Sequence, residues 1–444
     1  MNEILTNKIK EAGVTGAGGA GFPTAVKLGS APEYIIVNGV ECEPLIQVDQ
    51  QLTAMYAPLL LKTLDYLVEA LGARQGIFAL KEKYVRARQA LNGVIAEYPR
   101  LSIMPLVSAY PMGDEQVLVY ETIGKIVPEG GIPLNVGAMV INVESLLNIR
   151  HALEGKSVVE KYITVTGLVR NPRTFKVPLG ISMRALIEKA GGTTAADPVL
   201  IDGGPLMGRV ERNLEAPVIK TSKAIIVLNR DHPLILTKDR PLNRMMKLAQ
   251  TACCHCMMCS DLCPRQLLGH ALFPDKLMRL ASYNATCEKE VSATSAYLCC
   301  ECRLCEYACI MQLQPWKLNR ELKVRLKEAK IQNPHHAVPE KVNPFRQYRR
   351  YPTDKLVRQL GLAAFYHINA PFEAYDEVVS KVTLPLRQHF GAPALPVVKV
   401  GDVVRKGDRI ASMPEEALGA HVHASIDGTI RLIDAVAIVI EHGN

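Results

Sequence analysis

Apolar runs and helical patterns alternate along the first third of the chain. Residues 34–37 (YIIV) are a β-branched run typical of a buried strand, residues 57–71 have the periodicity of an amphipathic helix, and residues 76–80 are apolar again. This alternation predicts an α/β domain over residues 1–155, with a parallel sheet and covering helices. Ligands bind at the carboxyl ends of parallel strands, so polar clusters that follow the strands are candidate sites.

The pattern changes beyond residue 155. Two strand-like runs and a helical segment between residues 162 and 190 predict a β-grasp domain over 156–240. Residues 381–444 alternate short strands with glycine turns and resemble a barrel-sandwich hybrid of the biotinyl or lipoyl type. Where such domains carry a modified lysine, this chain has Ser-Ile-Asp at 425–427, so we expect neither biotin nor lipoate.

Composition agrees with a multidomain α/β protein. The chain has 444 residues, of which 48% are hydrophobic, and this length corresponds to about three domains. We expect no membrane span, because Lys62, Asp65 and Glu69 interrupt the best apolar stretch well short of the roughly 18 residues required. No secretory or transit signal is visible at the N-terminus, and we therefore expect a cytoplasmic location.

Charge argues against a nucleic acid partner. The 52 Lys and Arg exceed the 44 Asp and Glu by only 8, and residues 346–351 (RQYRRY) are the one place where basic and aromatic residues interleave. This run lies in a predicted basic linker with a helix over 331–380. We expect it to be a solvated connector or to grip an acidic patch of a partner.

Cysteine spacing predicts iron–sulfur chemistry. Eleven of the 12 cysteines fall between Cys253 and Cys309, where the spacing C-x2-C-x2-C-x3-C occurs twice, within 253–263 and within 299–309. Each run fits a [4Fe-4S] ligand set, and in two-cluster ferredoxins the fourth Cys of a run ligates the other cluster. We therefore predict two [4Fe-4S] clusters over 241–330, held by a first quartet (Cys253, Cys256, Cys259 and Cys309) and a second quartet (Cys299, Cys302, Cys305 and Cys263).

Two other interpretations of the cysteines fit the spacing less well. A disulfide framework is typical of small secreted chains, because a cytosolic compartment keeps thiols reduced. Zinc ribbons use isolated C-x2-C pairs and not three evenly spaced thiolates plus a fourth. Cys42, Cys254, Cys287 and Cys300 fall outside the spacing, and we interpret them as packing residues. Segments 266–281 and 292–298 have helical character, and nothing in this region suggests a nucleophile or an acid–base pair.

The first domain contains four polar loops. A glycine-rich segment at 16–24 (GAGGAGFPT) is followed by Lys27, and such loops cradle phosphates. The others are 38–44 (NGVECEP), 110–116 (YPMGDEQ) and 140–145 (VINVES). Together they resemble the flavin-binding family shared by respiratory complex I and the C subunit of the Rnf complex, with the motifs GxGGAGFPTxxK, NxxExEP and NVE[ST].

That resemblance implies a bound FMN and a residue set around it. By position, Phe22 and Glu43 would meet NADH, the electron donor, and the following would line FMN: Gly16, Gly18, Gly19, Lys27, Asn38, Glu41, Gly113, Glu115, Asn142 and Ser145. The chain departs from the complex I pattern at Ala17, Val40 and Asp114, where that pattern has Arg, Asp and Glu. A flavin between hydride donor and cluster is also chemically required, because NADH gives two electrons at once and a cluster takes one.

The order of the domains is similar to that found in one branch of this family. In the Rnf complex, a comparable barrel-sandwich module precedes the flavin domain, whereas here it comes last. The order here resembles the cobalamin reductases of propanediol-utilisation microcompartments over essentially the whole chain. This resemblance implies an NADH-dependent oxidoreductase that returns a corrinoid to its reduced state, with a corrinoid or an adenosyltransferase as acceptor. It also implies a place within a bacterial microcompartment and a possible shell protein partner.

Two further functions stay open. The chain could be an electron relay without turnover of free nicotinamide, or an Rnf-type component that a membrane partner anchors. Phe22 and Glu43 favour the enzyme. The sequence lacks an Asp-x-His-x-x-Gly element for replacing the lower ligand of cobalamin, so a preference for cobalamin rests on the resemblance alone.

Overall fold

A parallel sheet forms the centre of the N-terminal unit. The computed structural model describes residues 2–282, 287–288 and 291–443. Its first sheet has the order β3-β2-β1-β5, and all three pairings are parallel, as predicted. The strands are β1 (Tyr34–Gly39), β2 (Gln75–Lys81), β3 (Leu101–Leu106) and β5 (Ala138–Asn142).

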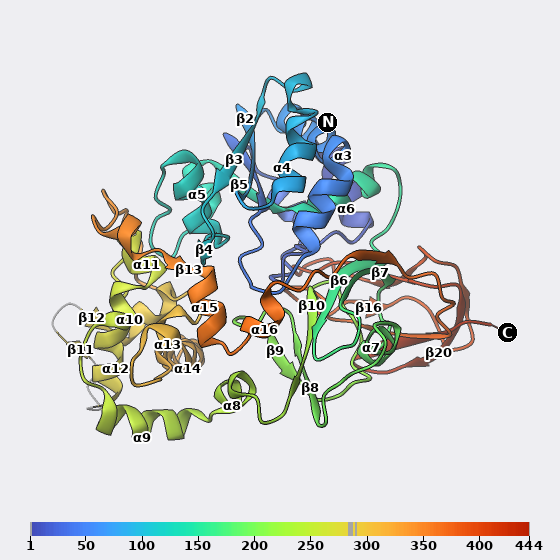
Figure 1. Cartoon of the computed structure of the whole chain (residues 1–444). Helices are drawn as coiled ribbons and strands as arrows, with labels where there is room; N and C mark the ends of the chain where they lie inside the picture. The colour runs from blue at the N-terminus through green and yellow to red at the C-terminus, as the bar shows by residue number, and fades with distance from the viewer. Residues whose placement is uncertain (1, 283–286, 289–290, 444) are drawn as a thin grey trace.

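Helices cover both faces of this sheet (Figure 1). The expected helix at 57–71 is part of a longer one, α3, which begins at Val48 and bends where Tyr56 leaves helical geometry before Pro58. The helices are α1 (Asn2–Glu11), α2 (Thr24–Leu28), α3 (Val48–Ala70), α4 (Val85–Asn92), α5 (Glu115–Ile123) and α6 (Val143–Leu153), with short turns η1 (Ile95–Glu97) and η2 (Pro133–Val136).

The β-grasp unit packs below the carboxyl end of the first sheet (Figure 1). Its six strands have the order β14-β7-β6-β10-β8-β9, and the predicted hairpin and helix are present. Its elements are β6 (Glu160–Gly167), β7 (Arg173–Pro178), α7 (Met183–Lys189), β8 (Pro198–Asp202), β9 (Arg209–Glu211), β10 (Ala224–Asn229), α8 (Pro233–Asp239) and β14 (Phe372–Ala374).

Short helices surround the cysteine motifs. The helix expected over 266–281 is wrong: α11 ends at Leu267, Gly269 takes a φ of +95°, and a new helix begins at Pro274. The elements are α9 (Leu242–Ala252), α10 (Met258–Asp261), α11 (Pro264–Leu267), α12 (Pro274–Ser282), β11 (Cys287–Glu288), β12 (Val291–Ser292), η3 (Ala293–Leu298), α13 (Leu304–Ala308) and α14 (Pro315–Glu328).

Residues 331–380 run across the molecule and are tied to it. β13 (Tyr351–Pro352) pairs with β4 (Ala109–Tyr110), and β14 adds a strand to the β-grasp sheet. The basic run is not a solvated connector, because Arg346 and Arg350 pair with Glu121 and Arg349 pairs with Asp261. The acidic patch it grips therefore belongs to this chain. The remaining elements are η4 (Arg346–Arg349), α15 (Thr353–Gln359) and α16 (Ala363–Tyr366).

The C-terminal unit consists of two small sheets that do not close into a barrel. Their orders are β15-β21-β20-β17 and β16-β18-β19. The strands are β15 (Lys381–Pro385), β16 (Leu395–Pro396), β17 (Val403–Val404), β18 (Arg409–Ser412), β19 (Val422–His423), β20 (Gly428–Ile433) and β21 (Ala437–Glu441).

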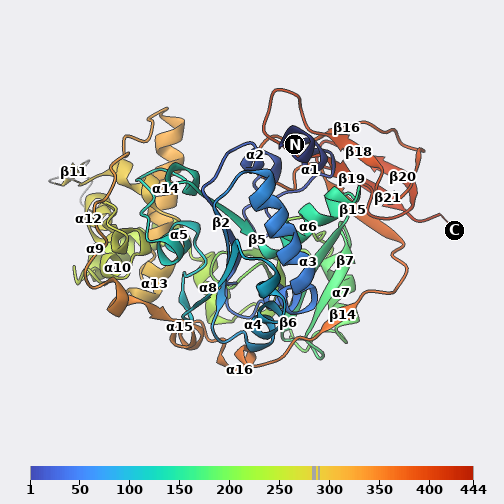
Figure 2. The ribbon, with the colours of Figure 1, turned by 90° about the horizontal axis from the view of Figure 1, so that it is seen from above.

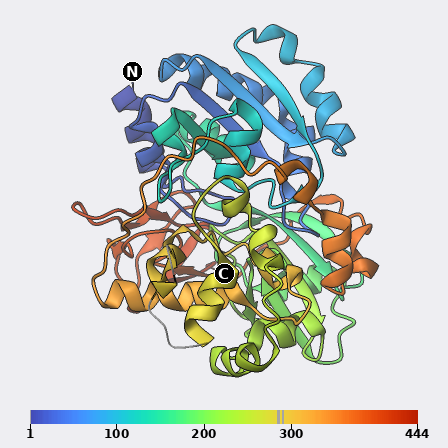
Figure 3. The ribbon, with the colours of Figure 1, turned by 90° about the vertical axis from the view of Figure 1, so that its left-hand side faces the viewer.

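The β-grasp, cysteine-rich and C-terminal units are arranged around the N-terminal unit, which contains the first sheet. Seen from above, the cysteine-rich unit and the C-terminal unit lie at opposite ends (Figure 2). Viewed from the cysteine-rich side, that unit lies in front, below the first sheet (Figure 3). The exact domain boundaries stay predictions. Within the described ranges, none of the helices has the length and apolar character needed to cross a bilayer.

Candidate functional site

The predicted flavin residues meet at the carboxyl edge of the first sheet. Asn38 is the last residue but one of β1 and Asn142 is the last of β5, and the two are register partners in neighbouring strands. Asn38 donates to the carbonyl of Gly113 at 2.9 Å. A Cβ on Gly18 would lie 3.4 Å from Asn142, so the glycine-rich loop passes directly beside this strand end.

The glycine-rich loop is fixed at both of its ends. The Ser145 hydroxyl accepts a hydrogen bond from the Ala17 amide at 2.8 Å. Lys27, from the helix after the loop, donates to Glu115 at 2.9 Å and to the Val140 carbonyl at 3.1 Å. The structure therefore brings together loops that are more than a hundred residues apart, as the resemblance implied.

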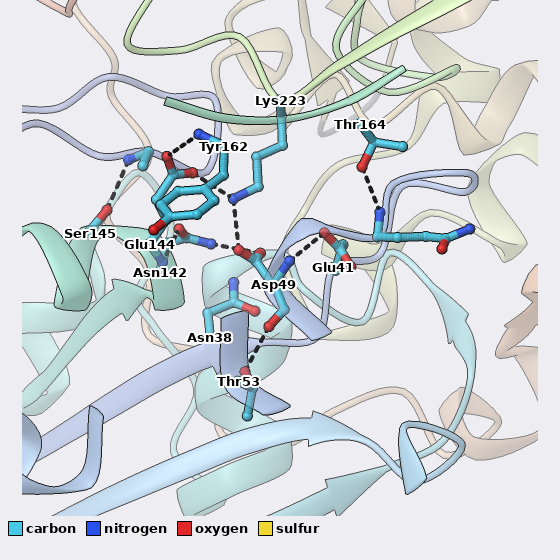
Figure 4. A network of polar contacts seen from close by, with 12 residues as sticks. Asn38, Glu41, Asp49, Thr53, Asn142, Glu144, Ser145, Tyr162, Thr164 and Lys223 are labelled. Atoms are coloured by element: carbon cyan, nitrogen blue, oxygen red, sulfur yellow. Dashed lines mark hydrogen bonds and ion pairs between the residues drawn. The ribbon is translucent and has the colours of Figure 1, made fainter. Parts of the chain in front are cut away.

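Buried charges that sequence reasoning missed lie between the first sheet and the β-grasp unit, where Lys223 reaches Asp49 (Figure 4). Lys223 lies between two carboxylates, 2.6 Å from Asp49 and 3.0 Å from Glu144. Lys161 is 2.6 Å from Glu144 and also donates to the Ala17 carbonyl at 3.2 Å. All four side chains are buried. The acids come from the first unit and the lysines from the β-grasp unit, so these ion pairs hold the two together.

In this network, attraction between the lysines and the carboxylates opposes the cost of burying their charges. Burial lowers the pKa of Lys161 to about 8. Burial also opposes the charge on Lys223, but Asp49 and Glu144 outweigh it and raise that pKa above its ordinary value. The signal for these residues was a lysine at the edge of an apolar strand run, as at 161 and 223, where a buried charge needs a partner.

Glu41 has one unpaired oxygen, and Gly19 has open space beside it. Glu41 accepts a hydrogen bond from the Asp49 amide through one oxygen, at 2.8 Å, while its other oxygen is buried without a partner among the described residues. Burial and the neighbouring Asp49 raise the pKa of Glu41 to about 7. Gly19 has a φ of +110°, with open space where a Cβ would stand. The open space at Gly19 fits a loop whose backbone a phosphate-bearing cofactor such as FMN can approach.

The two predicted NADH residues have different surroundings. Both carboxylate oxygens of Glu43 accept backbone hydrogen bonds, from the amides of Leu206 and Met207 at 2.9 Å each. Gly204 lies so close that a Cβ there would be 2.1 Å from Glu43. Phe22 instead stacks on Phe390, with ring centroids 6.1 Å apart.

The cysteines of the first quartet line one cavity. Cys253, Cys256, Cys259 and Cys309 all face it, together with methionines 257, 278 and 311. Cys309, from the second run, thus joins three cysteines of the first run. Among the described residues, no three His, Cys, Asp or Glu side chains gather closely enough to hold a single metal ion.

The second quartet lies deeper and contacts the first unit. Cys263, Cys302 and Cys305 are buried, and Cys299 is half-buried. Tyr110 donates from its hydroxyl to the Cys302 carbonyl at 2.8 Å. Arg265, two residues after Cys263, forms a bidentate pair with Asp114 at 2.6 and 2.9 Å.

The two cysteine loops share one backbone conformation. His255 and Met257 flank Cys256 with φ values of 56° and 63°, and Glu301 and Arg303 flank Cys302 with 57° and 65°. A short helix then begins in each run, at Met258 and at Leu304. These left-handed residues on either side of the second cysteine turn the chain back, so that three closely spaced thiols can face one centre.

Four domain families match the chain in sequence order. The Nuo51 FMN-binding domain matches residues 9–151, the SLBB domain 162–210, the 4Fe-4S dicluster domain 252–314 and the RnfC barrel sandwich hybrid domain 371–444. The predicted multidomain α/β fold is confirmed, with an FMN-binding domain and an iron–sulfur domain in one chain.

Curated relatives match the whole chain. Cobalamin reductase PduS of Citrobacter freundii is 41% identical over 99% of this chain and 97% of its own length. The protein of that name from Salmonella typhimurium is 41% identical, over 99% and 96%. The C component of the Na(+)-translocating ferredoxin:NAD(+) oxidoreductase complex of Acetobacterium woodii is 30% identical over 60% of this chain and 58% of its own.

Solved structures match in part. An NAD+-reducing [NiFe]-hydrogenase in the H2-reduced state aligns with a TM-score of 0.48 and 21% identity, covering 76% of this chain and 64% of the other.

Proposed function

The chain belongs to the family of cobalamin reductase PduS, and on that premise we propose that it is an oxidoreductase that passes electrons from NADH to cobalamin. FMN would take the hydride pair and release single electrons, which two [4Fe-4S] clusters would carry. The acceptor would be cob(III)alamin or cob(II)alamin: NADH plus two cob(III)alamin gives NAD+, one proton and two cob(II)alamin, and NADH plus two cob(II)alamin gives NAD+, one proton and two cob(I)alamin.

One observation carries this proposal: the flavin loops are bonded directly to a cysteine quartet. Tyr110 and Asp114 belong to the loop that also supplies Gly113 and Glu115, and they contact Cys302 and Arg265. The second quartet therefore lies against the flavin site without an intervening element. In a chain that only bound flavin, or only bound clusters, this junction would have no purpose.

The residues have separable roles in this proposal. The amides of the loop around Gly16, Gly18 and Gly19 would hold the phosphate, and Lys27 would neutralise part of its charge. Asn38, Glu41, Gly113, Glu115, Asn142 and Ser145 would position the flavin ring system. The buried pairs of Lys161 and Lys223 keep water away from beneath the site and fix the glycine-rich loop through the Ala17 carbonyl.

The Glu43 contacts favour a second candidate function. Two backbone amides already occupy its carboxylate, so this side chain is less free to meet a nucleotide. In the second candidate the chain is an electron relay, fed by a protein partner and without turnover of free NADH.

Stopped-flow absorbance separates the two candidates. The protein is reconstituted anaerobically with iron, sulfide and FMN, then mixed with NADH and afterwards with cob(II)alamin. The enzyme predicts flavin bleaching, then cluster bleaching, and then cob(I)alamin formation. A protein that binds FMN and both clusters but is bleached by dithionite and not by NADH would be the relay.

We also propose a location within a bacterial microcompartment, on the basis of the relatives' family. Affinity purification from cells grown on propanediol tests this. Recovery with shell proteins supports the location, and consistent recovery with membrane proteins would replace it with an Rnf-type assembly.

A further inference from the structure

A segment of the C-terminal unit reaches the glycine-rich loop at the opposite end of the chain. The amide of Phe390 donates to the Gly21 carbonyl at 2.9 Å. The Phe390 ring stacks on Phe22, with centroids 6.1 Å apart and planes 27° from parallel. A Cβ on Gly21 would be 3.1 Å from the His389 backbone, so loop and segment are in close contact.

This segment is held firmly on both sides of Phe390. His389 is buried, and its Nε2 accepts a hydrogen bond from the Ala420 amide at 3.1 Å. Gln388 accepts one from the Lys220 amide at 3.2 Å. The Ala392 amide donates to the Leu418 carbonyl at 2.8 Å. Phe390 as a residue is nevertheless 58% exposed, so a fixed backbone presents an exposed aromatic residue.

Phe22 contacts both Lys27, beside the predicted flavin residues, and Phe390 of the C-terminal unit. Lys27 lies 6.0 Å from the Phe22 ring and pairs with Glu115, a predicted flavin residue. Phe22 also contacts Phe390, which is exposed. A dinucleotide that places its hydride-donating ring among the enclosed flavin loops has its other ring, the purine, farther out.

We propose that Phe390 extends the aromatic surface begun by Phe22 and that the purine ring of the nicotinamide dinucleotide stacks on it. This inference rests on the proposed function, because it assumes that the nucleotide binds. Stacking on an aromatic side chain suits a purine, which has a flat π face and needs little else from a half-open surface. The C-terminal unit then has a binding role, and not only a structural one.

The test uses ADP-ribose, which contains the purine half of the dinucleotide and has no ring to reduce. Its binding to the FMN-loaded protein is measured by calorimetry for the wild type, Phe390→Ala and Phe390→Trp. Loss of base stacking predicts roughly five- to a hundred-fold weaker binding for the alanine variant. The tryptophan variant, which keeps a stacking face, should bind within about threefold of the wild type.

Phe345→Ala is the matched control. Phe345 is 57% exposed, almost the same as Phe390, but lies in the segment beside α11 and η4. This variant should bind ADP-ribose as the wild type does. In steady-state assays, Phe390→Ala should raise KM for NADH and leave kcat unchanged.

The outcomes are distinguishable. Equal ADP-ribose affinity of the wild type and Phe390→Ala overturns the role of Phe390 and leaves the proposed function intact. Failure of the wild type to bind NADH overturns both, whereas binding of NADH without any binding of ADP-ribose overturns the inference alone. If Phe390→Ala weakens binding only with a large loss of thermal stability, and Phe390→Trp does not restore the affinity, Phe390 merely docks the C-terminal unit and the inference is wrong.

Discussion

The two cysteine quartets share a backbone conformation but differ in their surroundings. In the second quartet three of four cysteines are buried, and hydrogen bonds tie the loop to the flavin site. Around the first quartet Cys256 is exposed, and Met257 and Ile310 are 47% and 69% exposed. Solvent exposure and hydrogen bonding set the reduction potential of a cluster. Identical spacing therefore does not give identical surroundings: one quartet lies against the loop predicted to bind flavin, and the other is open to solvent.

This difference extends to the whole molecule. The flavin end is enclosed by buried ion pairs between two domains, whereas the first quartet opens at the far edge of the cysteine-rich unit. The second quartet lies between them. An enclosed donor end protects reduced flavin from side reactions with water or oxygen, while an open end lets an acceptor approach. Each prediction below tests one part of this arrangement.

The largest expected effect is that of Cys302→Ala. This substitution removes a predicted ligand of the second quartet, which lies between the predicted flavin loops and the first quartet. Roughly half of the iron should be lost with FMN retained, and cob(II)alamin reduction should fall at least about 1,000-fold. Iron analysis, electron paramagnetic resonance and the acceptor assay measure this. Cys300→Ala is the control, because that neighbour lies outside the ligand spacing. Full iron retention in Cys302→Ala would contradict the ligand assignment.

Arg265→Met tests the anchoring of the second quartet. The substitution leaves Asp114 without its bidentate partner in a largely buried position, and we expect a loss of about 3 kcal/mol in unfolding free energy. Arg349→Met is the comparison: its pair with Asp261, which lies beside the first quartet, is more exposed and should contribute less than about 1 kcal/mol. Chemical denaturation followed by cluster absorbance gives both values. Equal losses would remove the distinction between an anchored and a loosely held quartet.

Glu41→Gln tests the predicted flavin end through the pH dependence of the protein's stability. The pKa of Glu41 is raised from 4.5 to about 7, so between these values the folded protein keeps a proton that the unfolded chain has released. Stability therefore falls as pH rises through this window, by roughly 3 kcal/mol. The variant lacks this fall, so it should gain on the wild type as pH rises from 4.5 to about 7. Thermal midpoints followed by flavin fluorescence measure the difference, and parallel pH profiles would contradict it.

Sequence patterns predicted what depends on local spacing. The strand run at 34–37 predicted β1, which carries Asn38 to the carboxyl edge of the sheet, and the repeated cysteine motif predicted two ligand quartets, which stay a prediction. Contacts between distant segments could not be foreseen, because nothing in the local sequence says that Lys223 meets Asp49 or that Phe390 meets Phe22. The unbroken helix over 266–281 failed for a related reason: helical periodicity continued past Gly269, whose positive φ ends the helix.

The smallest expected effect distinguishes the quartets without any mutation. When the reconstituted protein is treated anaerobically with an oxidant and an iron chelator, the first quartet should release its iron roughly tenfold faster than the second, because reagents reach Cys256 directly and reach Cys302 only after local opening. Paramagnetic resonance of samples withdrawn during the reaction and reduced with dithionite before freezing follows each signal, and Cys302→Ala identifies which signal belongs to which quartet. If both signals decay together, the exposure of Cys256 does not give reagents faster access to the first quartet. If the signal missing from Cys302→Ala is the one that decays first in the wild type, the second quartet is the open one and the order from flavin to surface is reversed.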